Sequence, residues 1–326
     1  MFGFGAVVGG RLATGLLDVT SDVAALDSSG FWVVVITFEG EVTCARFGSV
    51  RPWTPVDAAG LGPGPSLGRW RSSLSPAEFA GGVSHIHEAI ADGDVYQVNL
   101  TRRLAALGPS PSSLLPLFGR VAGAPHAAYV SLPGLSIASA SPERFLRREG
   151  RTVESQPIKG TAASVDGFLA KDRAENVMIV DLVRNDLGRV CEYGSVTVPA
   201  LCSVVPAPGL WHMVSTVRGV LRPGVGWGAL LEATFPPGSV VGAPKLAALD
   251  VIAKLEPVAR DVYCGAVGWV DADRCAGDLN VAIRTFWSRG PDVWFGTGGG
   301  ITWDSTAAGE WAETELKAAR LLALAS

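Results

Sequence analysis

Residues 156–161 read QPIKGT, and residues 175–182, one helix length further on, read ENVMIVDL. In the first stretch a proline restricts the backbone before Lys159, and a glycine after it permits conformations that other residues avoid. Lys159 is therefore held at a defined place. In the second stretch Glu175 precedes a run of apolar residues, where an unpaired charge would be costly. A rigidly presented amine near a half-buried carboxylate suggests covalent catalysis beside a metal. A solvent-exposed turn lysine and a helix-surface glutamate are the alternative interpretation.

The second stretch belongs to the clearest predicted helix, residues 170–187, because Glu175, Met178, Ile179 and Leu182 recur at i, i+3, i+4 and i+7. Similar spacing predicts helices over residues 76–91, capped by Ser75, and over residues 307–322. Val- and Ile-rich or alternating runs predict strands over residues 31–38, 41–47, 96–104, 127–131, 135–140, 145–148, 265–271, 279–285 and 293–295. Strands and helices mix without strict alternation, which favours an α+β fold or a layered sandwich over a doubly wound sheet.

The chain of 326 residues, 48% of them apolar, is long enough for one large domain or two. Residues 51–71 are rich in Pro, Gly and Ser, which is typical of a connection. We therefore predict a short β-rich segment and linker over residues 1–72, within the same fold as a catalytic domain over residues 73–326.

Charge and cysteine usage exclude several classes of protein. The formal net charge is −4 and no basic run exceeds two residues, which argues against a nucleic-acid partner. The five cysteines are scattered and form no Cys-x-x-Cys motif, which is typical of reduced thiols rather than a disulfide framework or a zinc site. The longest apolar run is too short to cross a bilayer and the N-terminus lacks a positive leader, so a soluble cytoplasmic protein is expected.

Further motifs follow the order found in the chorismate-utilising enzymes. They read DVYQVNLT (94–101), SPERF (141–145), RNDLGRV (184–190), PGSVVGAPK (237–245), AIRT (282–285), GGGI (298–301) and EWAET (310–314). From about residue 75 onward the chain resembles component I of the aminodeoxychorismate synthases, close relatives of anthranilate synthase component I. The resemblance implies a large α/β sandwich of mainly antiparallel sheets flanked by helices, with the active site in a cleft between its layers.

Two glutamates on different predicted helices are candidate metal ligands. The resemblance implies that Glu175 and Glu313 hold Mg²⁺, which binds the ring carboxylate of chorismate, with Glu310 a further candidate that acts through water. A hard cation of this kind wants few protein oxygens and keeps its own waters. The alternative for Glu313 is a surface ion pair with Lys317, four residues later, worth about 0.3–0.5 kcal/mol.

The resemblance also assigns the covalent chemistry. It implies that Lys159 attacks C2 of chorismate while the C4 hydroxyl leaves, after which ammonia adds at C4 and expels the lysine. A lysine that attacks carbon must be deprotonated, so burial or a nearby cation must lower its pKa. Glu143 of the Ser-Pro-Glu motif is the implied general acid for the departing hydroxyl. From the residues alone, Glu143 could instead pair with Arg144 or Arg148.

The second carboxylate of chorismate must be bound by a cationic side chain or by backbone N–H groups. Arg284, at a predicted strand end, suits planar bidentate recognition of a carboxylate, although an ion pair with Asp278 is the alternative. His212 matches a motif position near the ring and fits a satisfied core histidine equally well. By motif position, the remaining substrate-binding candidates are Thr161, Tyr263, Lys317 and the backbone of Gly298, Gly299 and Gly300.

Two positions separate the branches of the family. Anthranilate synthases usually carry alanine where this chain has Lys159, and isochorismate and salicylate synthases carry a lysine where it has Gln97. Gln97 has no basic nitrogen with which to activate water, so amination to 4-amino-4-deoxychorismate, in a 4-aminobenzoate and folate type of pathway, is preferred. Anthranilate synthase component I and a catalytically silent chorismate-binding paralogue are the alternatives.

The nitrogen source follows from the cysteines. None of the five lies in a Gly-x-Cys-x-Gly nucleophile turn, so the chain is not expected to hydrolyse glutamine. It should therefore use free ammonia or ammonia from a separate glutamine amidotransferase subunit.

Overall fold

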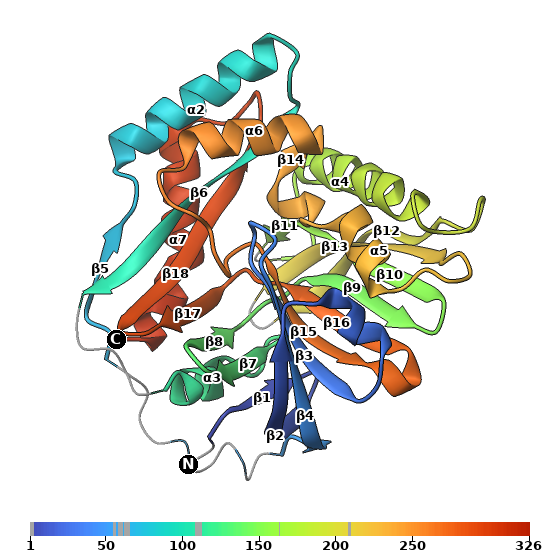
Figure 1. Cartoon of the computed structure of the whole chain (residues 1–326). Helices are drawn as coiled ribbons and strands as arrows, with labels where there is room; N and C mark the ends of the chain where they lie inside the picture. Colours follow the sequence, from blue (N-terminus) through green and yellow to red (C-terminus); the bar gives the residue numbers. More distant parts are fainter. Residues whose placement is uncertain are drawn as a thin grey trace.

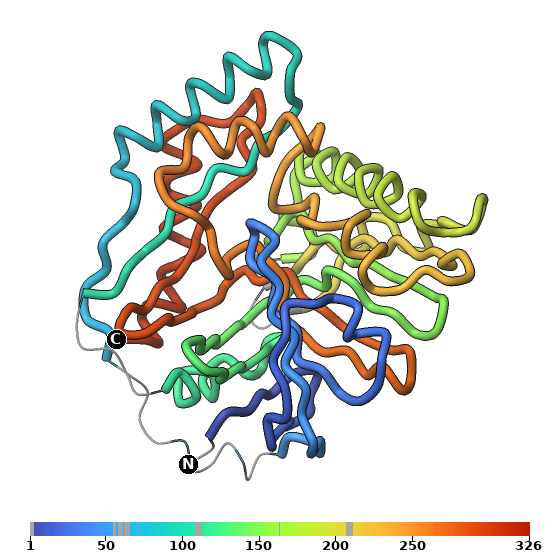
Figure 2. The backbone as a smooth tube through the Cα atoms, viewed as in Figure 1, coloured from blue at the N-terminus to red at the C-terminus, as the bar shows by residue number. Residues whose placement is uncertain are grey.

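The computed structural model describes residues 3–54, 57, 61, 66–107, 113–162, 164–207 and 210–326, and its chain is drawn in Figures 1 and 2. Its helices are α2 (Pro76–Ala91), α3 (Leu115–Val121), α4 (Ala170–Gly188), α5 (Trp227–Thr234), α6 (Lys245–Leu255) and α7 (Ala307–Leu324). Its strands are β1 (Gly5–Val8), β2 (Arg11–Thr20), β3 (Phe31–Ile36), β4 (Val42–Pro52), β5 (Arg69–Ser72), β6 (Gln97–Leu107), β7 (Ala128–Leu132), β8 (Leu135–Ser139), β9 (Arg144–Glu149), β10 (Thr152–Gln156), β11 (Ile158–Ala162), β12 (Thr197–Ala207), β13 (Leu210–Val220), β14 (Gly242–Ala243), β15 (Ala266–Asp271), β16 (Ala276–Val281), β17 (Thr285–Arg289) and β18 (Asp292–Ile301).

The strands form one connected network whose strand–strand ladders are antiparallel, and helices flank it, which confirms the predicted α+β class. In Figure 1, α2, α6 and α7 surround β6 and β18, whereas α4 and α5 lie beside β10 to β13. β3 pairs with β15 and β1 pairs with β7, so strands from both sides of residue 72 belong to this network. None of the described helices has the length and apolar character needed to span a membrane.

The predicted start of α2 is confirmed in atomic detail. Ser75 accepts a hydrogen bond from the backbone N–H of Glu78, and the Glu78 carboxylate accepts one from the backbone N–H of Ser75. This reciprocal pairing satisfies two donors at the helix start. Apolar side chains of α2, among them Phe79 and Ile86, then pack in a cluster with Leu100 of β6 and Val251 of α6.

The face that α4 buries differs from the predicted stripe. The side chains fully buried on this helix are Asn176, Ile179, Val180, Val183, Asp186 and Leu187, which pack toward β13 and its neighbours. Glu175, Met178 and Leu182 are only half-buried. The apolar residues 177–180 lie on both sides of the helix, so the buried face predicted from periodicity is displaced by about one residue from the observed one. Glu175 lies at the border of the observed buried face.

Two further predictions need correction. The strand predicted over residues 279–285 is broken, because β16 ends at Val281, β17 begins at Thr285, and Arg284 has a left-handed backbone with φ 53°. No extended strand can continue through that conformation. The connection predicted over residues 51–71 is also shorter, since β4 runs to Pro52 and β5 starts at Arg69. Part of that connection lies outside the described residues.

Candidate active site

Lys159 lies on β11, which pairs with β13 and packs against α4. Gly160 follows with φ +89°, and a Cβ there would approach the Asp172 Cβ to 3.0 Å, so glycine is required on both conformational and steric grounds. Burial lowers the pKa of Lys159, and nearby Lys317 lowers it further, while Glu175, Glu143 and Glu313 oppose the shift. The predicted amine is therefore surrounded by the predicted carboxylates.

Glu143 lies between β8 and β9 and is 4% exposed. Its backbone is fixed on both sides, because its N–H donates to Ser141 Oγ at 3.2 Å and its carbonyl accepts from Val281 N–H at 3.0 Å. Burial raises the pKa of Glu143 to about 7, although the Ser239 side chain, Lys159, the Ile158 N–H and Arg284 all favour the carboxylate. The site thus holds a carboxylic acid that exchanges its proton near neutral pH.

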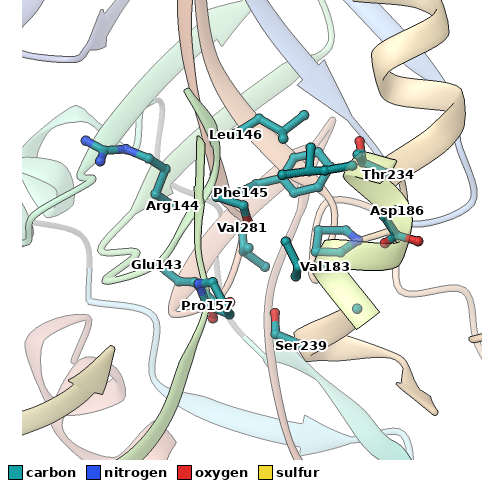
Figure 3. Close-up of a pocket in the computed structure, with 14 residues that line it drawn as sticks. Glu143, Arg144, Phe145, Leu146, Pro157, Val183, Asp186, Thr234, Ser239 and Val281 are labelled. Carbon is teal, nitrogen blue, oxygen red and sulfur yellow. The ribbon is translucent and has the colours of Figure 1, made fainter. Parts of the chain in front are cut away.

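The alternative partners of Glu143 are engaged elsewhere. Arg144 binds Asp278 through two hydrogen bonds of 3.1 and 3.2 Å, and Arg148 lies 3.6 Å from Asp27. Figure 3 shows Arg144 pointing away from the pocket, whereas Glu143, Pro157 and Ser239 line it together. This pocket continues past Val183 to the buried ion pair of Asp186 and Lys245, whose charged atoms are 2.6 Å apart.

The candidate metal ligands are Glu175 on α4 and Glu310 and Glu313 on α7. Burial raises the pKa of Glu175, and Glu310 adds to that shift. Burial also raises the pKa of Glu310, and Glu313 adds to it. Each of these carboxylates therefore disfavours the charge on its neighbour.

Glu313 is also paired with a lysine. Its Oε1 lies 2.6 Å from Lys317 Nζ, and this lysine holds its pKa below the usual value although burial acts the other way. Lys317 Nζ donates to the carbonyl of Gly298 at 3.0 Å. A Cβ on residue 299 would lie 2.9 Å from Glu310 Oε2, so the glycine strand permits the acidic side chains to approach its backbone. The ion pair considered as the alternative for Glu313 is thus present beside the carboxylate cluster.

The donor set fits Mg²⁺. Within the described part of the chain, no group of three His, Cys, Asp or Glu side chains is placed to hold a metal ion. Mg²⁺ does not need one, because it usually takes one or two protein carboxylates and completes its shell with waters and substrate oxygens. Carboxylates that disfavour the charge on a neighbouring carboxylate would be stabilised by such a cation. Glu175 and Glu313 are the residues that would hold it, with Glu310 close by.

We predict that Glu175→Gln and Glu313→Gln each weaken Mg²⁺ binding by about ten-fold or more, because a hard cation needs anionic oxygen. Calorimetric titration of each variant with Mg²⁺ alone measures this directly. Asp181→Asn is the matched control, because Asp181 is an exposed carboxylate of α4 that pairs with Arg184. Unchanged Mg²⁺ affinity in both glutamine variants would exclude this metal site.

Arg284 lies in the break between β16 and β17, and its carbonyl accepts a hydrogen bond from Ala140 N–H at 3.0 Å. Burial lowers the pKa of Arg284, Glu143 opposes the shift and Arg320 reinforces it. No described carboxylate lies within ion-pairing distance of Arg284, and Asp278, its alternative partner, binds Arg144. A strained non-glycine backbone and an unpaired guanidinium next to Glu143 are suited to binding a substrate anion.

His212 and Thr161 lie opposite each other on β13 and β11. His212 Nδ1 is 3.0 Å from Thr161 Oγ1. Burial, together with the charge of Arg284, lowers the pKa of His212 to about 4, so the imidazole is neutral at neutral pH. These two candidates therefore offer neutral hydrogen bonds beside Arg284.

Tyr263 lies in a different pocket. A Cβ on residue 296 would be 2.1 Å from Tyr263 Cγ, so the ring is packed directly on β18. It lines a pocket together with Arg102, Glu256, Arg260 and Trp287. The structure does not bring Tyr263 to the pocket of Glu143 and Ser239.

Two residues near the site were missed by sequence reasoning. Ser239, which affects the pKa of Glu143, lies in the motif PGSVVGAPK, from which no site residue is predicted. Arg320, which lies close enough to Arg284 to affect its pKa, occurs three residues after Lys317 on the stripe of α7 that carries Glu313. Extending that helical stripe by one turn would have identified Arg320, whereas no sequence signal links Ser239 to Glu143.

Known proteins resemble this chain in sequence. The family model described as chorismate binding enzyme matches residues 55–323. Aminodeoxychorismate synthase component 1 of Klebsiella aerogenes is 40% identical over 268 residues, which are 78% of this chain and 59% of that protein. Anthranilate synthase component 1 of Streptomyces coelicolor is 39% identical over 267 residues, 78% of this chain and 52% of that protein. The chain thus spans less than two thirds of the length of these relatives.

A solved structure supports the fold. The menaquinone-specific isochorismate synthase of Escherichia coli superposes with a TM-score of 0.81, covering 100% of this chain and 89% of that one. Its sequence identity is 17%, so this likeness concerns the fold alone.

Proposed function

The chain belongs to the chorismate binding enzyme family, and we propose that it aminates chorismate at C4, with ammonia, to give 4-amino-4-deoxychorismate. One observation carries this proposal: Lys159, with a pKa lowered by burial, lies beside Glu143, whose pKa is raised to about 7. A lysine whose free amine form is favoured by burial, and a carboxyl group that is partly protonated near neutral pH, are the nucleophile and the general acid that the displacement of a hydroxyl group needs.

In the first step the free amine of Lys159 forms a bond to C2 of chorismate. Both ring double bonds shift, the bond from C4 to its oxygen breaks, and Glu143 gives its proton to that oxygen, which leaves as water. Ammonia then bonds to C4, the bond from C2 to Lys159 breaks, and Lys159 leaves as the free amine. The new ammonium group returns a proton to Glu143, so the sum is one ammonia consumed and one water released.

The remaining residues bind and orient the substrate in this proposal. Arg284 would pair with one carboxylate of chorismate, with neutral His212 and Thr161 beside it. Mg²⁺, when held by Glu175 and Glu313, would supply positive charge for the ring carboxylate. The left-handed backbone of Arg284 and the hydrogen bond of Lys317 to the Gly298 carbonyl keep these groups in place before substrate arrives.

The nitrogen source is proposed to be ammonia delivered by a separate glutamine amidotransferase subunit. The printed name of the Klebsiella relative, component 1, is consistent with a second component in that system. In this chain none of the cysteines lies in the nucleophile turn that a glutaminase of that kind uses.

We expect the purified chain, given chorismate, Mg²⁺ and ammonium, to form a product with the mass of 4-amino-4-deoxychorismate. Glutamine in place of ammonium should give almost none. Mass spectrometry of the products distinguishes the alternatives, because anthranilate synthase activity would release anthranilate and pyruvate and a silent paralogue would leave chorismate unchanged. Robust amination from glutamine alone would contradict the proposed division between two subunits.

A further inference from the structure

A fully buried asparagine joins the helix of one candidate metal ligand to the strand next to the candidate nucleophile. Asn176 follows Glu175 on α4. Its Nδ2 donates to the carbonyl of Met213 on β13 at 3.2 Å, and its Oδ1 accepts a hydrogen bond from Ser215 Oγ on the same strand. Asparagine is a poor residue for a helix interior, and burying its amide is costly unless the amide is hydrogen-bonded. Both ends of this amide are bound to β13, so it fixes α4 against that strand.

Ser215 extends this contact to the strands on either side of β13. Its Oγ, which is fully buried, accepts a hydrogen bond from the backbone N–H of Cys202 on β12 at 2.8 Å. Its N–H donates to the carbonyl of Pro157 at 3.1 Å, and Pro157 lies two residues before Lys159. Ser215 therefore connects the helix that carries Glu175 with the strand that carries Lys159.

The strands on both sides of β13 are irregular at this level. In β11 the register shifts across Lys159 and Gly160, and in β12 it shifts across Leu201 and Cys202. Cys202 also has a left-handed backbone with φ 53°. Irregularities of this kind change the direction of side chains and leave backbone groups without their usual strand partners. Regular pairing alone therefore does not fix the segment that presents Lys159, and the hydrogen bonds of Ser215 contribute to holding it.

We propose that Asn176 and Ser215 are positioning residues that set the distance between Glu175 and Lys159, an inference that rests on the proposed function and deepens it. Both side chains are buried and bound to protein groups, so they act through their neighbours and not on the substrate. In the proposed reaction Lys159 must reach C2 of chorismate while the ring carboxylate is held on the side of Glu175. A small shift of α4 along β13 would disturb that geometry and slow the reaction.

The test uses two variants of different kinds. Ser215→Ala removes the central hydroxyl, and Asn176→Leu removes the amide but suits a buried position in a helix. Each should lower kcat for amination by about ten- to hundred-fold, because a displacement of about 1 Å in an active site can cost this much. The KM for chorismate at saturating Mg²⁺ should stay nearly unchanged.

Ser195→Ala is the matched control. Ser195 Oγ also accepts a hydrogen bond from a backbone N–H of β13, that of Val220 at 3.1 Å, and it donates to the Glu192 carbonyl at 2.8 Å. This variant loses the same kind of contact elsewhere on the strand, so it should lower the melting temperature and keep kcat.

Titration with Mg²⁺ alone separates positioning from a general loss of packing. Ser215→Ala should weaken Mg²⁺ binding by about ten-fold, as expected for a group that orients a metal ligand. In a Glu175→Gln background the same change should have no further effect, because the carboxylate that it displaces is already absent. In a Glu313→Gln background the loss should persist, because Glu175 is still present.

The outcomes separate this inference from the proposed function. Unchanged Mg²⁺ affinity in both Ser215→Ala and Asn176→Leu would overturn the inference. A loss of kcat in Ser195→Ala as large as in Ser215→Ala would also overturn it, since that result would indicate general damage to the fold. If the unmodified chain binds Mg²⁺ but forms no amine, the proposed function fails, and the Mg²⁺ titrations still decide the role of Asn176.

Discussion

Replacing Lys159 with alanine should reduce amination of chorismate by about 10³-fold or more, equivalent to about 4 kcal/mol of transition-state stabilisation. The reason is that no other amine is placed to form the bond to C2. Lys317, the other lysine close to Lys159, is bound by Glu313 at 2.6 Å and by the Gly298 carbonyl. Chorismate binding should remain, because Arg284 and the carboxylate cluster are untouched. Steady-state rates and a chorismate titration measure both effects.

A matched lysine variant controls for general damage to the fold. Lys254 is an exposed residue of α6, so Lys254→Ala should keep full activity. An intermediate trapped by mass spectrometry should be attached to the peptide that contains Lys159. Full activity in Lys159→Ala, or an intermediate on another residue, would exclude the covalent route.

Replacing Glu143 with glutamine should lower kcat by about 10²–10⁴-fold, because water is then no longer formed by proton transfer to the leaving hydroxyl. The pKa of Glu143 is about 7, so the acid form is lost as the pH rises through that value. For the unmodified chain, kcat/KM should therefore fall above about pH 7. In Glu143→Gln the residual activity should lack this limb, because an amide does not titrate.

The glutamine variant also separates catalysis from packing. Glutamine keeps the size of the side chain and its hydrogen bond with Ser239, so the melting temperature should not fall. A matched control is Glu154→Gln on β10, a half-buried carboxylate that binds Arg218 at 2.8 Å outside the pocket. A rate that still declines above pH 7 in Glu143→Gln would assign that limb to another group and would remove Glu143 as the acid.

Local sequence determined several elements around the site, although not β11 and β13, the strands that carry Lys159 and His212. The capping box of Ser75 and Glu78, the helices beginning near residues 76, 170 and 307, and the mixed order of strands were all predictable, because capping and periodicity are properties of neighbouring residues. The proline and glycine around Lys159 also indicated a fixed amine, and Gly160 has the positive φ that this reading requires. The family motifs then indicated which side chains share a site, since the residues alone left Glu143, Arg284 and Glu313 open to ordinary ion pairs.

Only the tertiary structure decided which of these charged side chains form ion pairs and which do not. Arg144, and not Arg284, binds Asp278, because β9 and β16 are neighbouring strands and Arg144 lies opposite Asn280, two residues from Asp278. Glu143 is left without an ion pair, and burial between Val281 and Ser239 raises its pKa, an effect of surrounding atoms that no neighbouring residue in the chain reveals. The left-handed backbone at Arg284 and the buried amide of Asn176 were likewise hidden, because both depend on contacts between distant parts of the chain. The Arg284 carbonyl accepts a hydrogen bond from Ala140 N–H, and Asn176 accepts one from Ser215, 39 residues away. Sequence specified the chemical groups, and packing of distant strands set their protonation and their partners.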